Sequence, residues 1–160
     1  MTTEQVAGTA AERPALGLSL LGGHDDAVAI VSAGRELTYA ELARLVDQRG
    51  RELGDPDRLL VLEMSNDLPS VVTYLAALAI GRPVVVVGPG RHEDVVERYR
   101  PALLATPGGD RTLRPRGPAP VLHPELAVLL STSGSTGSPK LVRLSRDNVL
   151  ANARSIAAYL

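Results

Sequence analysis

The alternation of short apolar runs with amphipathic segments constrains the fold of this chain more than any other feature. The apolar runs are 27–32, 58–64, 84–87, 103–106, 126–131 and 140–145. Those at 58–64 and 84–87 show no polar alternation, which is typical of strands covered on both faces. Segments with helical spacing lie between most of them. This order predicts an α/β fold in which strands and helices alternate and the sheet is mainly parallel.

The first helix has the clearest boundaries. The run 27–32 and a return through Leu37 predict a hairpin, after which Thr38 precedes Glu41 by three residues. That spacing forms a capping box, in which the hydroxyl and the carboxylate each bind a backbone N–H of the other's residue. Apolar residues then recur every three or four positions, so a helix is predicted over 39–53.

The remaining helices are predicted from cap residues, glycine and proline. One helix is predicted over 68–80, with Ser65, Asn66 or Asp67 as its cap and Gly81 at its end. A second is predicted over 91–100, and its start at His92, Glu93 and Asp94 is expected to face solvent. A last helix is predicted to run through Tyr159, with Ser145 or Asp147 as its cap.

Composition limits the classes of function. The 160 residues suffice for one domain, and 44% of them are hydrophobic, which disfavours disorder. The net charge of −1 gives no reason to expect nucleic acid as a partner, and no apolar stretch is long enough to cross a membrane. The start of the sequence shows no positively charged segment leading into an apolar run, so we expect a cytoplasmic protein. The absence of cysteine excludes disulfides and cysteine zinc sites. Residues 1–22 are predicted to be a flexible arm, 23–160 the folded domain, and 107–120 a proline- and glycine-rich surface loop.

The segment 131–138 is the strongest candidate for a binding site. Six of its eight residues carry hydroxyls and two are glycine, and Lys140, the only lysine in the chain, follows closely. Glycines let backbone N–H groups converge on one point, and a single ammonium adds positive charge, a combination that suits a polyphosphate. Pro139 before the lysine and Leu141 after it exclude a Walker A motif. A Gly/Ser surface loop without a ligand is the open alternative.

The sequence STSGSTGSPK (131–140) resembles the phosphate-binding loop of the adenylate-forming superfamily. That group holds acyl- and aryl-CoA synthetases, luciferases and the adenylation domains of nonribosomal peptide synthetases. The pattern T-S-G-S-T-G-x-P-K matches at every fixed position, and 37–53, 68–87 and 144–153 resemble further segments in the expected order. The resemblance implies the N-terminal α/β part of a larger adenylation domain, with the C-terminal part of that domain outside these 160 residues.

The resemblance also implies roles for individual residues. Lys140 would neutralise the departing pyrophosphate, while Leu141 and Arg146 stand where many relatives have glycine and histidine. ATP and Mg²⁺ are the implied cofactors, with the metal ligands mostly outside this sequence, so neither a metal ligand nor a certain catalytic residue is assigned within 1–160. The residues expected to wrap the β- and γ-phosphates of ATP are Thr132, Ser133, Gly134, Ser135, Thr136 and Gly137.

Enzymes of this superfamily join a carboxylic acid or amino acid to AMP and pass the acyl group to a thiol of CoA or of a carrier-protein pantetheine. On this resemblance, 1–160 alone is expected to be inactive as a ligase. The alternative is a non-catalytic nucleotide- or partner-binding module derived from such an enzyme. Because 84–87 and 126–130 are too apolar for an open sheet edge, a complementary polypeptide or self-association is also expected. A fold that closes its own core is the other possibility.

Overall fold

The computed structural model describes residues 21–114, 120–131 and 141–159. Four helices lie within these ranges: α2 (Tyr39–Leu53), α3 (Leu68–Ala79), α4 (Glu93–Tyr99) and α5 (Arg146–Tyr159). The strands are β1 (Val28–Ser32), β2 (Arg35–Thr38), β3 (Leu60–Glu63), β4 (Val84–Val87), β5 (Leu103–Thr106), β6 (Gly109–Thr112), β7 (Leu126–Ser131) and β8 (Leu141–Ser145). The predicted flexible arm falls almost wholly outside the described residues and stays a prediction.

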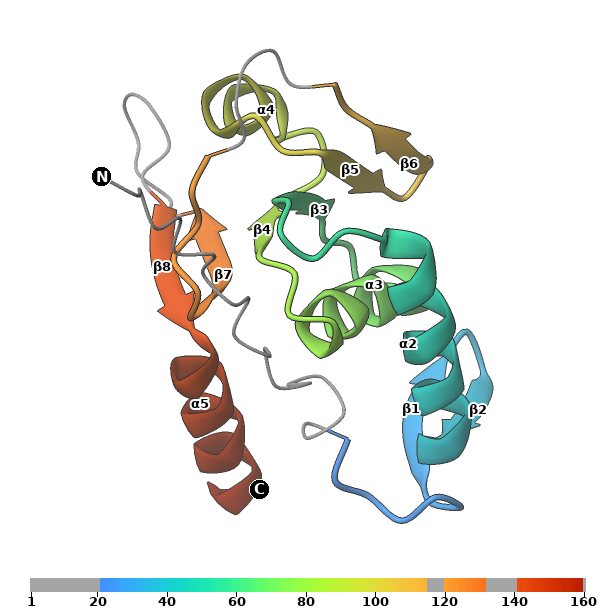
Figure 1. Cartoon of the computed structure of the whole chain (residues 1–160). Coiled ribbons are helices and arrows are strands. Elements are labelled where there is room, and N and C mark those ends of the chain that lie inside the picture. Colours follow the sequence, from blue (N-terminus) through green and yellow to red (C-terminus); the bar gives the residue numbers. More distant parts are fainter. Residues whose placement is uncertain (1–20, 115–119, 132–140, 160) are drawn as a thin grey trace, which may run out of the picture.

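Six strands form one sheet in the order β6-β5-β3-β4-β7-β8, and β1 pairs with β2 in a separate hairpin (Figure 1). The pairs β5–β3, β3–β4 and β4–β7 are parallel, whereas β6 and β8 are antiparallel to their neighbours. The predicted α/β fold with a mainly parallel sheet is therefore confirmed.

The helix boundaries follow from local capping. The Thr38 hydroxyl accepts a hydrogen bond from the Glu41 N–H at 3.2 Å, and the Thr38 N–H donates to Glu41 Oε2 at 2.9 Å. The predicted capping box and the helix over 39–53 are both confirmed. Asp67 caps α3, since its Oδ1 accepts a bond from the Ser70 N–H at 2.8 Å. Each cap satisfies backbone donors that the helix itself leaves free.

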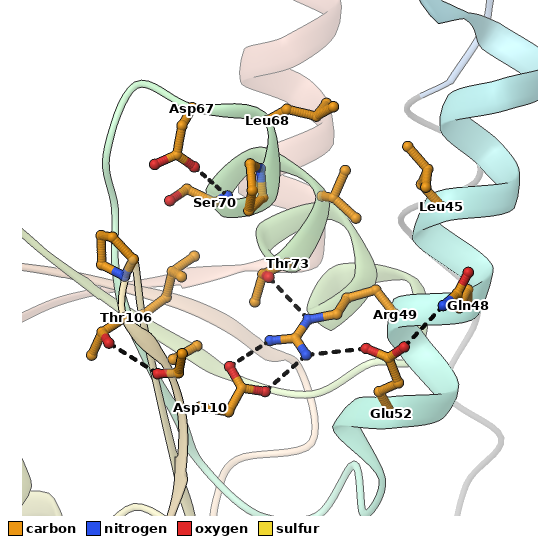
Figure 2. Close-up of a pocket in the computed structure, with 16 residues that line it drawn as sticks. Leu45, Gln48, Arg49, Glu52, Asp67, Leu68, Ser70, Thr73, Thr106 and Asp110 are labelled. Atoms are coloured by element: carbon orange, nitrogen blue, oxygen red, sulfur yellow. Dashed lines mark hydrogen bonds and ion pairs between the residues drawn. The ribbon is translucent and has the colours of Figure 1, made fainter.

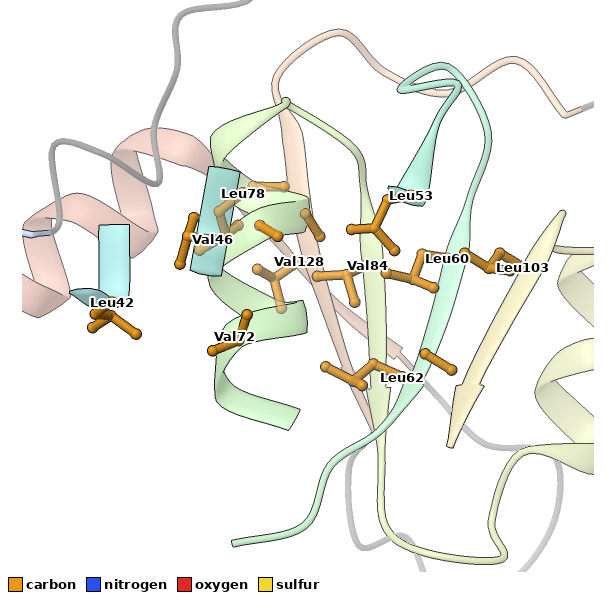
Figure 3. Close-up of a cluster of buried hydrophobic side chains, with 14 residues drawn as sticks. Leu42, Val46, Leu53, Leu60, Leu62, Val72, Leu78, Val84, Leu103 and Val128 are labelled. Atoms are coloured by element: carbon orange, nitrogen blue, oxygen red, sulfur yellow. The ribbon is translucent and has the colours of Figure 1, made fainter. Parts of the chain in front are cut away.

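Alternating side chains of each strand build two cores, one on each face of the sheet. Leu60 and Leu62 point to the face covered by α2 and α3, where they pack among aliphatic residues such as Val46 (Figure 3). Val61 points to the other face, where Val95 of α4 covers it. This alternation is the two-residue period of a strand, and it explains why the central strands read as continuous apolar runs.

The prediction that 107–120 is wholly a surface loop was wrong in part. Residues Gly109–Thr112 form β6, which pairs with β5 through a tight turn at Pro107 and Gly108. Gly109 has a φ of +118°, a conformation that suits glycine. All four residues of β6 are exposed, so the strand lacks the apolar alternation that marks strands in a sequence.

The open edges of the sheet are not at the apolar strands 84–87 and 126–130, where exposure was a concern. The apolar strands β4 and β7 are both inside the sheet, each with two neighbours. In the part of the chain that the structure describes, the two outer strands are β6 and β8. β6 is polar, and β8 carries an exposed Val142.

Candidate functional site

The carboxyl ends of the four parallel strands meet at one edge of the sheet. Glu63 of β3 is level with Val87 of β4, and Val86 is level with Leu130 of β7. Ser131, the next residue of β7, therefore ends at the same edge. Ligands of open α/β sheets bind at this edge, because the loops that leave the strands there are free to form a site.

The predicted phosphate-binding segment begins and ends at this edge. Thr132, Ser133, Gly134, Ser135, Thr136, Gly137 and Lys140 lie outside the described residues. Both flanks are described: β7 ends at Ser131, β8 begins at Leu141, and these two residues are paired in the antiparallel ladder. The segment 132–140 thus connects two neighbouring antiparallel strands at the carboxyl edge of β7.

Glu63 is a buried carboxylate at the same edge, and sequence reasoning missed it. The residue is only 6% exposed. Its Oε1 accepts a hydrogen bond from the Gly90 N–H at 2.8 Å and contacts Nδ1 of His92. A buried carboxylate needs such partners to offset lost hydration. The expectation that His92 faces solvent is corrected, because Glu63 holds its ring against the end of β3. The available signal was one acidic residue closing an apolar run.

Asp67 is a second acid near this edge, in the connection that leaves β3. Hydrogen bonds lower the pKa of its carboxyl group, first from the Ser65 hydroxyl and then from the Ser70 N–H. Both bonds favour the ionised form, so the cap of α3 carries a negative charge at neutral pH. Its charge lies at the N-terminus of the helix, where it is also favourable for the helix dipole.

A pocket of about 640 Å³ opens beside Asp67, on the face of the sheet that carries α2 and α3. Arg49 of α2 spans one wall (Figure 2): it donates from Nε to Thr73 of α3 at 3.0 Å and from a terminal nitrogen to Asp110 of β6 at 2.8 Å. A third bond reaches Glu52 at 3.3 Å. The hydrogen bond with Asp110 is the main cause that raises the pKa of Arg49.

Arg146 ties the start of α5 to the opposite end of the sheet. Its guanidinium donates to the carbonyl oxygen of Pro124 at 2.7 Å and to that of Gly81 at 3.2 Å. Gly81 follows α3, so the bond joins the helix after β8 to the end of α3. These two hydrogen bonds give Arg146 a structural role. Ser145 caps this helix, as one of the two predicted alternatives, through a 3.2 Å bond from the Asn148 N–H.

The described residues show neither a grouped set of metal-binding side chains nor a helix suited to a membrane. Within 21–114, 120–131 and 141–159, no three His, Cys, Asp or Glu side chains are grouped so that they could hold a metal ion. No helix in those ranges is long and apolar enough to span a membrane.

Known proteins resemble this chain in sequence and in structure. No protein-family model matches it. The nonribosomal peptide synthetase GRA1 of Gibberella zeae is 29% identical over 166 aligned positions, which cover 84% of this chain and 2% of the synthetase. ATP-bound MatB from Rhodopseudomonas palustris superposes with a TM-score of 0.70 at 22% identity, covering 91% of this chain and 37% of MatB.

The N-terminal subdomain of NpsA from Klebsiella oxytoca, in complex with 3-hydroxyanthranilyl-AMSN, superposes with a TM-score of 0.62 at 22% identity. That match covers 82% of this chain and 39% of the NpsA chain. This chain thus spans well under half the length of the relatives named here.

The six-stranded, mostly parallel sheet is the fold of the N-terminal domain of adenylate-forming enzymes. The predicted resemblance to adenylate-forming enzymes agrees with this fold and with the sequence similarity to a nonribosomal peptide synthetase.

Proposed function

We propose that this chain is the ATP-phosphate-binding N-terminal part of an acyl- or aminoacyl-adenylate-forming ligase. The observation that carries the proposal is the pairing of Ser131 with Leu141. It fixes both ends of the segment 132–140 at the carboxyl edge of the sheet, where ligands of such sheets bind. The ATP bound to the structurally similar MatB supports the same ligand.

In the proposed reaction, a carboxylate oxygen of the acid attacks the α-phosphorus of ATP. The bond from that phosphorus to the bridging oxygen breaks, and pyrophosphate leaves with the electron pair. The N–H and hydroxyl groups of Thr132–Gly137 would donate to the β- and γ-phosphate oxygens, and Lys140 would offset the charge that accumulates there. Such donors lower the barrier because they bind the leaving group more strongly in the transition state than in the ground state. Mg²⁺ would add charge neutralisation when bound.

The second half-reaction transfers the acyl group to a thiol, with AMP leaving. The acid, and a thiol from CoA or from a carrier-protein pantetheine, are the proposed partners. The similarity to a nonribosomal peptide synthetase supports a carrier protein among these choices. A complementary polypeptide or a second copy is proposed as a further partner at the exposed side of β8.

The test is an exchange assay between labelled pyrophosphate and ATP, run with a panel of carboxylic and amino acids. We expect ATP or pyrophosphate to bind the chain, and exchange to appear only when the remaining part of an adenylation domain is supplied. A non-catalytic module, the second candidate, predicts binding without exchange in both conditions. Absence of any phosphate binding would contradict both.

A further inference from the structure

The pocket between α2, α3 and the β5–β6 hairpin lies at the point where the strand order reverses. The chain passes from β3 outward to β4 and then returns across β3 to β5. The first connection, α3, packs on one face of the sheet, and the second, α4, packs on the other. Crevices at the carboxyl ends of strands at such a reversal are the usual ligand sites of α/β sheets.

The described residues that line the pocket come from parts of the fold other than β7, which precedes the segment 132–140. Leu62 of β3 and Thr106 of β5 line the pocket, whereas that segment follows β7, with β4 lying between β3 and β7. Its volume of about 640 Å³ lies within the roughly 300–1,000 Å³ of small-molecule sites. Much of the lining is aliphatic: Leu45, Leu62, Leu68, Pro69, Val72, Ala105 and Pro107.

The charged side chains of the pocket leave it with excess negative charge. Among the described residues that line it, Arg49 is the one cation, against the three carboxylates of Glu52, Asp67 and Asp110. Asp110 is bound by Arg49 through both oxygens at 2.8 Å. A carboxylate has about four acceptor positions, so Asp110 can accept further hydrogen bonds after those two.

The strong donors of the pocket already donate within the protein. Arg49 donates to Thr73, Glu52 and Asp110. The Thr106 hydroxyl donates to the carbonyl oxygen of Gly109 at 2.9 Å, and Gln48 donates to Glu52 at 3.1 Å. The groups that remain for a ligand are mainly acceptors, so a ligand must bring its own donors and, given the charge, a positive one.

We propose that this pocket binds a small organic cation, an amine on an aliphatic body. Its ammonium group would lie near the carboxylates of Glu52 and Asp110, and its body would contact the aliphatic lining. To reach Arg49, an anionic ligand would have to displace the carboxylate of Glu52 or of Asp110. It would also be repelled by the two carboxylates that remain in the pocket, one of them Asp67. The test of this proposal uses no nucleotide, so its outcome can be distinguished from that of the proposed ATP binding.

The test compares three ligands with the same six-carbon body: hexylammonium, hexanol and hexanoate. Each is titrated into the full ¹⁵N-labelled chain, and the backbone amide shifts are followed by NMR. We expect saturable shifts at Arg49, Ser70, Thr106 and Asp110 with hexylammonium. Hexanoate should bind at least about ten-fold more weakly, because its head group is repelled where the ammonium is attracted.

Asp110→Asn provides the matched variant, since the amide oxygen still accepts from Arg49 while the charge is lost. Hexylammonium should bind about three- to five-fold more weakly, and hexanol, which carries no charge, should lose less affinity than hexylammonium. Asp47→Asn, on the exposed side of α2, removes the same charge away from the pocket and should change neither. Equal binding of hexanoate and hexylammonium, shifts confined to other residues, or no shifts at all would overturn the proposal.

Discussion

Arg49 of α2 and Asp110 of β6 are 61 residues apart in the sequence, and the guanidinium of one donates to the carboxylate of the other at 2.8 Å. The same guanidinium binds Thr73 of α3. One side chain therefore joins two helices to the outermost strand of the sheet, which is otherwise held by its pairing with β5.

Asp110→Asn should loosen that strand without unfolding the protein. The pair is partly exposed, with 18% and 35% of the two side chains accessible, so we expect a loss of up to about 1 kcal/mol in the free energy of unfolding. Amides of β6 should exchange faster with solvent, whereas those of β3 and β4 should not. Urea denaturation and hydrogen exchange measure the two effects.

The control for this prediction is Asp47→Asn. Asp47 pairs with Arg51 on the solvent side of α2, where the two side chains are 62% and 75% exposed. An exposed pair of this kind contributes little to stability, so no measurable change is expected. An equal loss in both variants would show that the link to β6 has no special role.

Thr38→Ala should remove the capping box of α2. The variant loses the hydroxyl that accepts from the Glu41 N–H, and we expect the free energy of unfolding to fall by about 1 kcal/mol. Thr38→Ser keeps the acceptor and should stay near the parent value. If the alanine and serine variants have equal stability, tertiary packing alone holds the start of this helix.

Asp67 should make stability depend on pH in the acid range. Its pKa is lower in the folded state than the value of about 3.9 in an unfolded chain. The resulting stabilisation is complete above the unfolded value and is lost as the pH falls through the folded one. Asn is also a good N-cap, so Asp67→Asn should fold but lack this part of the acid dependence. Thermal melts of both proteins between pH 2 and pH 6 measure the difference, and parallel curves would contradict the prediction.

Lys140→Ala should weaken binding of pyrophosphate or ATP by about ten- to a hundred-fold, the effect of losing a charge-assisted contact worth about 1.5–3 kcal/mol. Titration calorimetry with the full chain measures the affinity. Arg154→Ala removes an exposed cation of α5 and serves as the control for general charge. If the Lys140 and Arg154 variants bind pyrophosphate or ATP equally well, the alternative that 131–140 is a surface loop without a ligand is favoured.

Val142→Lys should reduce any association through β8. That strand pairs with β7 on one side, and Val142 is 45% exposed. A charged side chain on an outer strand opposes edge-to-edge pairing. Sedimentation velocity over a concentration series should show a shift toward monomer. A parent protein that is monomeric at every concentration would contradict self-association at this strand.

The sequence by itself determined the local elements. The spacing of Thr38 and Glu41 predicts the helix over 39–53, because caps act over three or four residues. For the next helix, the sequence offers a group of possible caps at 65–67 and an end at Gly81, and the structure selects Asp67. The continuous apolar runs likewise predict the central strands and their burial on both faces. The motif at 131–140 is also a local pattern in the sequence. The structure describes the strands on either side of it, and phosphate binding by its residues stays a prediction.

Only the tertiary structure decided how these elements meet. The polar residues of β6 form a strand because β5 supplies backbone hydrogen-bond partners. No apolar pattern in the sequence predicts that pairing. The contact of Glu63 with His92 and the reach of Arg49 to Asp110 arise from the strand order, which places distant segments side by side. Such contacts depend on the closure of long loops and on packing, and no short-range residue pattern encodes either.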